Sequence, residues 1–207
     1  MPTTLFMRGF FYPSDEAPTD LSSDTDLALD SSRGPTAQSA QTSTVAGPTS
    51  GRQVNPGVPL SWWYRVNAVT ISGSITKNLR MSETNMSANV GAQIIIDRHD
   101  SAGTFVSTVA NHERGTELVV TTETAENWST GTVTSTSFSD GDYIRVRVYG
   151  NDVGTMASGY FFHFYYDGPT AAASGDSYVT FTETITAYTP AAERVPRFSP
   201  YPQLLGH

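Results

Sequence analysis

The chain has 207 residues, no cysteine and a formal net charge of -8, with a pI near 4.8. Without cysteine there is no disulfide, no thiolate nucleophile and no Cys-ligated zinc. The acidic balance argues against a nucleic-acid partner, because phosphate binding needs a surplus of Lys and Arg. No apolar run approaches the roughly 20 residues that span a bilayer, so we expect no membrane partner either.

The first 59 residues differ in composition from the rest of the chain. Residues 1–12 form a mainly apolar segment that Arg8 interrupts, and they lack the basic-then-apolar order of a signal peptide, which favours synthesis in the cytoplasm. Residues 13–59 are rich in Ser, Thr, Pro and Gly and contain no aromatic residue. Such a stretch cannot bury enough apolar area to offset its ordering entropy. We therefore predict an extended arm over residues 1–59, whose apolar anchor for a partner consists of Phe6, Phe10, Phe11 and Tyr12.

Residues 60–189 alternate apolar and polar side chains as β-strands do. In the segment 143–149, for example, Ile144, Val146 and Val148 share one face while two arginines share the other. Further strands are expected at residues 104–110, 116–122 and 177–188, among others, and turn formers such as Asp140-Gly141 separate the segments. Eight to ten short strands without a helical period predict an all-β fold. We expect a single antiparallel β-sandwich, jelly-roll-like, whose connectivity the sequence leaves open.

Residues 190–207 form a third region, in which frequent prolines disfavour both helix and sheet pairing. We predict an extended Pro-rich tail. It carries apolar side chains that free tails usually lack, and we expect these to bind a partner: Phe198, Tyr201, Leu204 and Leu205.

A search for chemistry gives no catalytic residue, no cofactor motif and no metal site. The histidines lack the spacing of a metal site on one element; they are His99, His112, His163 and His207. Three acidic residues in turns, Asp140, Asp142 and Asp152, leave calcium open as an alternative. We favour the interpretation that they cap turns beside glycines, and we predict that the chain is not an enzyme.

Glu183 and the Trp62-Trp63-Tyr64 run are the two anomalies of residues 60–189. Glu183 shares its parity with apolar residues, and a buried carboxylate is costly unless paired. In order of preference, the explanations are a bulge that turns it outward, a pair with an arginine such as Arg80 or Arg98, and a catalytic acid. The aromatic run suits core or interface packing better than sugar stacking, because alternation sends Trp63 to the opposite face from its neighbours.

Three sequence segments resemble motifs in virion proteins of tailed bacteriophages. They are the segments 138–146 (FSDGDYIRV), 165–168 (YYDG) and 174–185 (SGDSYVTFTETI). The resemblance covers about a third of the chain and implies a decoration, minor capsid or tail-associated protein without catalytic residues.

The resemblance and the flanking segments lead to one expectation for function. We expect a virion structural protein, foremost a capsid decoration or cement protein, that binds the major capsid protein or other virion subunits through its arms. Self-association into a homo-oligomer fits the same picture. The alternative is a tail, neck or fibre component with a carbohydrate- or receptor-binding sandwich.

Overall fold

The structure, a computed structural model, describes residues 1–11, 26–31, 39–44, 52–53, 61–128, 131–154, 159–166 and 176–190. These residues form strands and connecting turns, and the prediction of an all-β fold is confirmed. Within these ranges, no helix has the length and apolar character needed to cross a membrane.

The described residues form fourteen strands. In chain order they are β1 (Thr3–Phe11), β2 (Asp26–Asp30), β3 (Ser39–Thr44), β4 (Arg52–Gln53), β5 (Ser61–Arg65), β6 (Val69–Ile71), β7 (Ile75–Glu83), β8 (Val90–His99), β9 (Phe105–Glu117), β10 (Thr124–Trp128), β11 (Thr136–Phe138), β12 (Tyr143–Asp152), β13 (Phe161–Tyr166) and β14 (Tyr178–Phe181).

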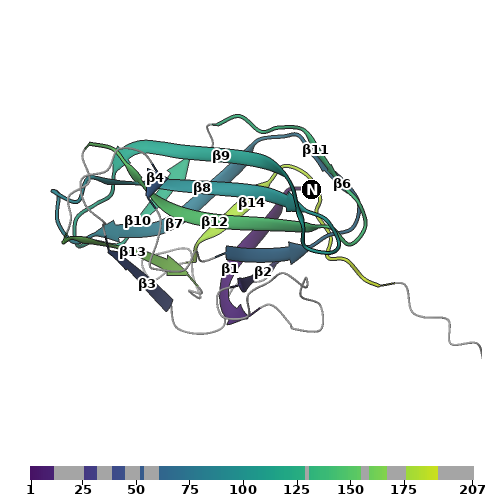
Figure 1. The fold of residues 1–207 in the computed structure, drawn as a ribbon, viewed down its shortest axis with the longest axis horizontal. Coiled ribbons are helices and arrows are strands. Elements are labelled where there is room, and N and C mark those ends of the chain that lie inside the picture. The colour runs from purple at the N-terminus through teal and green to yellow at the C-terminus, as the bar shows by residue number, and fades with distance from the viewer. Residues whose placement is uncertain are drawn as a thin grey trace, which may run out of the picture.

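Twelve of these strands belong to one curled sheet. Its order is β3-β13-β7-β14-β1-β2-β5-β12-β8-β9, with β10 paired to β7 and β4 paired to β12. The remaining two strands, β6 and β11, pair with each other at one end of the molecule (Figure 1). The sheet is mixed and not purely antiparallel, because β2 runs parallel to β5.

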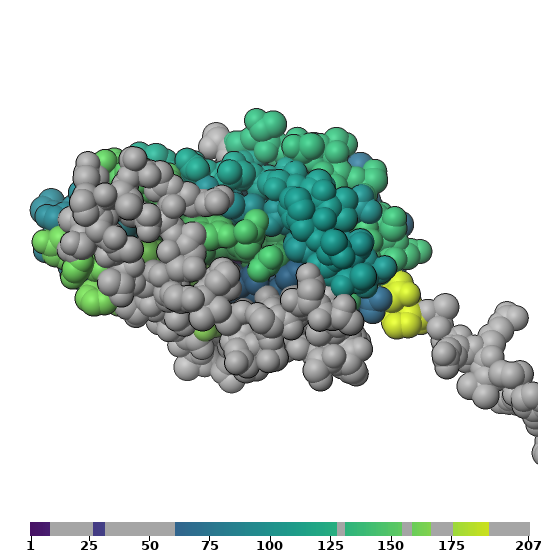
Figure 2. Space-filling model, in the orientation of Figure 1, coloured from purple at the N-terminus to yellow at the C-terminus, as the bar shows by residue number. Residues whose placement is uncertain are grey.

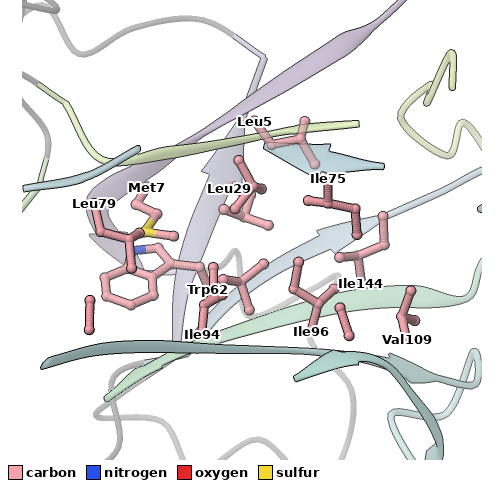
Figure 3. Close-up of a cluster of buried hydrophobic side chains, with 14 of the residues drawn as sticks. Leu5, Met7, Leu29, Trp62, Ile75, Leu79, Ile94, Ile96, Val109 and Ile144 are labelled. Carbon is pink, nitrogen blue, oxygen red and sulfur yellow. The ribbon is translucent and has the colours of Figure 1, made fainter. Parts of the chain in front are cut away.

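The curled sheet turns back on itself at β1 and β2, so that its two halves face each other across the core. Figure 3 shows Leu5, Met7, Ile75 and Leu79 on one side of this core, facing Trp62, Ile94, Ile96 and Ile144 on the other. All eight side chains are fully buried. Burial of a large apolar side chain contributes about 1.5–3 kcal/mol, so this double layer is the main source of stability.

The N-terminal strand belongs to this sheet and not to an arm directed at a neighbour. β1 pairs antiparallel with β14, where Leu5 lies opposite Val179, and also with β2. Leu5 and Met7 are in the core. The expectation of an extended arm over residues 1–59 therefore differs from the structure, because the alternating side chains of β1 complete the core of their own chain. Within the same range, β2, β3 and β4 also pair with strands of this sheet.

Two predicted strands have different bounds in the structure. The sequence suggested separate strands at residues 104–110 and 116–122, whereas β9 runs continuously over Phe105–Glu117. The last strand was expected to continue to residue 188, but β14 ends at Phe181. Bulges in the pairing of β8 with β9 keep the long strand in contact with its partner.

Candidate binding face

The side of the sheet that faces away from the core carries an ordered set of polar and aromatic residues on β5, β12, β8 and β9. We call this surface the polar face. Strand register places its members in four rows, each running across the strands. The rows are Arg65, Tyr143, His99 and Phe105; Trp63, Arg145, Asp97 and Thr108; Ser61, Arg147, Ile95 and Asn111; and Tyr149, Gln93 and Glu113.

An ion pair lies at the centre of the polar face. The Nη2 group of Arg147 on β12 donates to Oδ2 of Asp97 on β8. The other carboxylate oxygen of Asp97 accepts a hydrogen bond of 2.9 Å from Thr108 Oγ1 on β9. Arg147 Nη1 also donates to the Tyr149 hydroxyl at 2.9 Å. Because the Asp97 side chain is only 1% exposed, this network holds three strands in one arrangement and fixes both charges.

Aromatic rings and arginines pack beside the ion pair. The Arg145 guanidinium lies 4.9 Å from the centre of the Trp63 ring, within cation–π range, and donates to Ser61 Oγ at 3.2 Å. His99 packs edge-on against Trp63, with ring centres 4.6 Å apart. His99 also packs edge-on against Phe105, with ring centres 5.8 Å apart. The series starts at buried Trp63 and ends at Phe105, which is 55% exposed.

Amide and carboxylate groups form the third part of the polar face. Gln93 Nε2 donates to Asn111 Oδ1 at 2.8 Å and to Glu113 Oε1 at 2.9 Å. Asn151 Nδ2 approaches Glu113 Oε2 at 3.4 Å. Gln93 is buried, whereas Asn111 and Glu113 are exposed at the edge strand. Buried Gln93 therefore holds the exposed acceptors Asn111 Oδ1 and Glu113 Oε1 in place.

This geometry suits recognition of another polar surface. Arg, Trp and Tyr are enriched at protein interfaces, and side chains whose positions are already fixed lose less entropy on binding. The accessible end of the polar face is on β9, at Phe105, Asn111 and Glu113. Figure 2 shows that the teal segment that includes β9 lies at the molecular surface on the side viewed.

The described part of the structure does not gather the side chains that were predicted to bind a partner into one site. Phe6 is 9% exposed and packs edge-on against Tyr178 of the same chain, with ring centres 5.5 Å apart. Phe10 and Phe11 belong to β1 by their backbone, but their side chains lie outside the described part of the structure. Also outside the described residues are Tyr12, Phe198, Tyr201, Leu204 and Leu205.

The acidic turn residues cap main-chain groups. Asp140 Oδ1 accepts from the Ala68 amide at 2.7 Å, and Asp152 Oδ1 accepts from the Gly154 amide at 3.1 Å. Asp142 Oδ2 accepts from Arg98 Nε at 2.8 Å and from the Ser139 amide at 2.9 Å. Within the described ranges no three His, Asp or Glu side chains gather closely enough to hold a metal ion. These contacts agree with the interpretation that the three aspartates cap turns.

Glu183 takes a position that none of the three explanations anticipated in full. The chain leaves the strand after Phe181, and Glu183 Oε1 accepts hydrogen bonds from the amides of Ser72 at 2.8 Å and Gly73 at 2.6 Å. Burial raises the pKa of this carboxyl group, but the amide hydrogen bonds outweigh burial, and the pKa is lowered overall. Its described partners are main-chain amides and the Thr182 hydroxyl, which donates to Oε2 at 3.1 Å, and not an arginine.

The Trp62-Trp63-Tyr64 run packs inward on both faces. Trp62 is in the core, and Trp63 is 2% exposed although it belongs to the polar face. The sugar-stacking alternative therefore finds no accessible tryptophan ring here, and the preference for packing agrees with the burial of both rings.

Charged and titratable groups also lie inside the curled sheet, and the alternation of the sequence did not predict their burial. Lys77 on β7 is fully buried, and burial lowers its pKa to about 8. His112 on β9 is buried as well, and burial and the Lys77 charge lower its pKa against the hydrogen bond to the Thr132 carbonyl. Arg114 forms an ion pair with buried Glu126. The neutral form of His112 is therefore favoured beside this ion pair and Lys77.

Sequence reasoning missed the polar face as a unit. The alternation of Arg145 and Arg147 on one side of their strand was visible, but their partners on β5 and β8 were not. Those partners depend on strand order, which side-chain periodicity does not specify.

No protein-family model matches the sequence, and no curated protein is detectably similar to it. Solved structures do share the fold. An aminopeptidase from a marine sediment Thaumarchaeota archaeon superposes with a TM-score of 0.58 at 10% identity, over 90% of this chain and 37% of the enzyme. A CocE/NonD family hydrolase from Staphylococcus aureus gives a TM-score of 0.52 at 12% identity, over 87% of this chain and 36% of the enzyme. The chain thus spans just over a third of the length of these hydrolases.

A virion protein is also among the matches. The infectious bursal disease virus VP2 subviral particle gives a TM-score of 0.37 at 11% identity, over 83% of this chain and 38% of VP2. That score is too low to support an argument. At these identities, the hydrolase matches show a shared fold alone. They nevertheless contradict the prediction that the chain is not an enzyme, because the same fold occurs in two hydrolases, with TM-scores of 0.52 and 0.58.

Proposed function

We propose that this chain is a β-sheet module that works in contact with other protein subunits, through the β9 end of its polar face. The supporting observation is the network in which buried Asp97 and Gln93 hold residues of β9 in fixed positions. A rigid surface of arginine, aromatic and amide groups suits recognition of a protein partner. The site of contact would centre on Phe105.

The more specific form of the proposal is a virion structural protein, located in the virion and bound to the major capsid protein or other virion subunits. Its support is the resemblance of residues 138–146, 165–168 and 174–185 to motifs in phage virion proteins. These segments contribute to β12, β13 and β14. Capsid decoration is the first choice. A tail, neck or fibre component that binds a receptor or carbohydrate is the alternative, and a homo-oligomer is compatible with either.

Aromatic and aliphatic groups near the two ends of the chain would add to such contacts. Burial of each against a partner would contribute about 1.5–3 kcal/mol. The candidates, apart from Phe6, which packs within its own chain, are Phe10, Phe11, Tyr12, Phe198, Tyr201, Leu204 and Leu205.

Occupancy on particles that contain the chain tests this proposal. Phe105→Arg places a charge at the β9 end of the polar face, and Met86→Arg places the same charge on another exposed apolar residue, in the β7–β8 connection. We expect Phe105→Arg to lower the copies per particle at least about tenfold, because a charge buried at an interface costs more than 1.4 kcal/mol. Quantitative mass spectrometry of purified particles measures this.

Met86→Arg should retain full occupancy, and both variants should melt near the temperature of the wild-type chain. Full occupancy of Phe105→Arg would remove the polar face from the proposal. A second pair of variants, with Phe198 and Tyr201 changed to Ser and with Ser199 changed to Ala as the control, tests the C-terminal groups in the same way.

A second candidate is a module of a hydrolase, and the shared fold with the archaeal aminopeptidase favours it. In this case the chain would act together with the part of a larger enzyme that it does not cover. Release of product from aminoacyl and simple ester substrates by the purified chain would support an activity of its own. Turnover that appears only when a second protein is added would support the module interpretation.

A further inference from the structure

Two glutamates meet where three strands come together at one end of the curled sheet. Glu83 is the last residue of β7 and is fully buried. Glu117 is the last residue of β9 and lies opposite Gly91 of β8. The two carboxyl groups are within hydrogen-bonding reach of each other.

Glu83 joins both halves of the sheet through its main chain and its side chain. Its Oε2 atom accepts a hydrogen bond of 3.1 Å from the Val90 amide at the start of β8. Its own amide donates to the Val119 carbonyl at 3.2 Å, and its carbonyl accepts from the Thr121 amide at 2.7 Å. Residues 118–121 are therefore attached to β7 through Glu83.

The remaining oxygens of the pair imply a shared proton. Glu83 Oε1 and Glu117 Oε1 are both buried, and neither has a hydrogen-bond donor in the described structure. Two ionised carboxylates cannot share a buried site without strong repulsion, whereas one proton between them supplies the missing donor. Burial is the main cause that raises the pKa of Glu83 to about 7, and the neighbouring Glu117 raises it further. The hydrogen bond from the Val90 amide acts in the opposite direction.

Glu117 is the charged neighbour that acts on Glu83 among the described residues. Glu83 lies opposite Phe162 of β13, and β8 contributes the Val90 amide. His163 lies opposite Ser82, the residue before Glu83 in β7, and so points to the other side of that strand. Arg114 of β9 is paired with Glu126. Among the described residues, no cation is one of the groups that shift the pKa of Glu83.

The segment that the pair holds is itself strained. Thr121 has a φ of 57°, a left-handed conformation that is costly for a β-branched residue and persists only when its surroundings enforce it. Its amide hydrogen bond to Glu83 is part of that enforcement. Weakening the carboxyl pair would therefore favour release of residues 118–121.

We propose that Glu83 and Glu117 form a proton-operated clasp, closed when they share a proton and loosened when both are ionised, which sets how firmly residues 118–121 are attached to β7. The clasp does not depend on the proposed function. Because the native state holds this proton more tightly than the unfolded chain does, the clasp stabilises the fold fully below the ordinary glutamate range. Its contribution is lost as the pH rises from about 4.5 through about 7.

The test compares unfolding of the full chain at pH 5 and pH 8. From the two pKa values of Glu83, loss of the clasp raises the wild-type unfolding equilibrium constant by up to roughly 70-fold between pH 5 and pH 8. Glu83→Gln keeps a donor for Glu117 and should remove this part of the pH dependence. Glu117→Gln should reduce this pH dependence without removing it, because burial still raises the pKa of Glu83, and it provides the test if Glu83→Gln does not fold.

Hydrogen exchange at the Thr121 amide reports on the segment itself. After correction for intrinsic rates, wild-type protection should fall at pH 8, while Glu83→Gln should keep its protection at both pH values. Asp152→Asn, which removes a carboxylate from β12 but keeps the oxygen that accepts from the Gly154 amide, is the control and should behave as the wild-type chain does.

Equal pH dependence of the wild-type chain and both glutamine variants would overturn the clasp. So would recovery of wild-type stability at pH 8 by millimolar Ca²⁺ or Mg²⁺ that Glu83→Gln does not show, since a cation and not a proton would then hold the pair.

Discussion

Trp62 donates its indole Nε1 hydrogen to the main-chain carbonyl of Arg8 over 3.1 Å, which connects β5 to β1 inside the core. Both groups are buried, and the bond joins residues 54 positions apart in the sequence. The N-terminal strand is therefore held by packing and by a specific hydrogen bond. This hydrogen bond helps to hold β1 (residues 3–11) in the folded sheet.

The first prediction concerns the contribution of β1 to stability. Leu5→Ala should lower the free energy of unfolding by about 2–5 kcal/mol, because it leaves a cavity in a fully buried position. Met86→Ala, at a position that is 69% exposed, should change it by less than about 0.5 kcal/mol. Urea unfolding followed by tryptophan fluorescence measures both. Equal and small effects would mean that β1 does not complete the core.

The second prediction addresses the centre of the polar face. Asp97→Ala should destabilise the chain by about 3 kcal/mol, because it leaves the Arg147 charge without its partner in a partly buried site. A double-mutant cycle with Arg147→Ala should give a coupling energy of more than about 1 kcal/mol. Additive effects in that cycle would show that the network does not fix the face.

The third prediction concerns a close approach between strands. A Cβ atom at Gly150 would lie 2.9 Å from the Phe162 ring and 2.9 Å from Val90 Cγ1. Gly150→Ala should cost about 1–3 kcal/mol by overpacking. Gly115→Ala, where nothing lies within 4 Å, is the matched control and should be nearly neutral. Thermal unfolding of both variants distinguishes them, and a neutral Gly150→Ala would contradict the packing of β12 against β13.

The fourth prediction is an acid dependence with the opposite sign to that of the clasp. The lowered pKa of Glu183 means that its contribution to stability is present above the ordinary glutamate pKa of 4.5. It is lost as the pH falls through the lower pKa of the folded state. Glu183→Gln should therefore flatten the stability profile below about pH 4.5, as measured by urea unfolding at closely spaced pH values. A profile identical to that of the wild-type chain would show that the amides of Ser72 and Gly73 do not hold an anion.

Strand content was predictable because alternation is a local property. The period of two in residues 143–149 identified β12 and the faces of its side chains. Strand pairing was not predictable in the same way. The partner of β1 is β14, about 175 residues away in sequence, and a short apolar segment reads equally well as a core strand or as an anchor for a neighbour.

The candidate site shows the same division. Sequence parity placed Arg145 and Arg147 together, but Asp97 and Trp63 joined them only through pairing with β8 and β5. The carboxyl pair of Glu83 and Glu117 was invisible for a similar reason. Its members are 34 positions apart on strands that are not paired with each other, and only the curl of the sheet brings their side chains together.

The central claim, that the β9 end of the polar face binds a neighbouring subunit, is tested most directly by a cryo-EM map of the particle that carries this chain. We predict density of another subunit packed against Phe105 and the exposed residues of β9. A map in which this face points to solvent in every copy, or purified particles that lack the chain, would contradict the account.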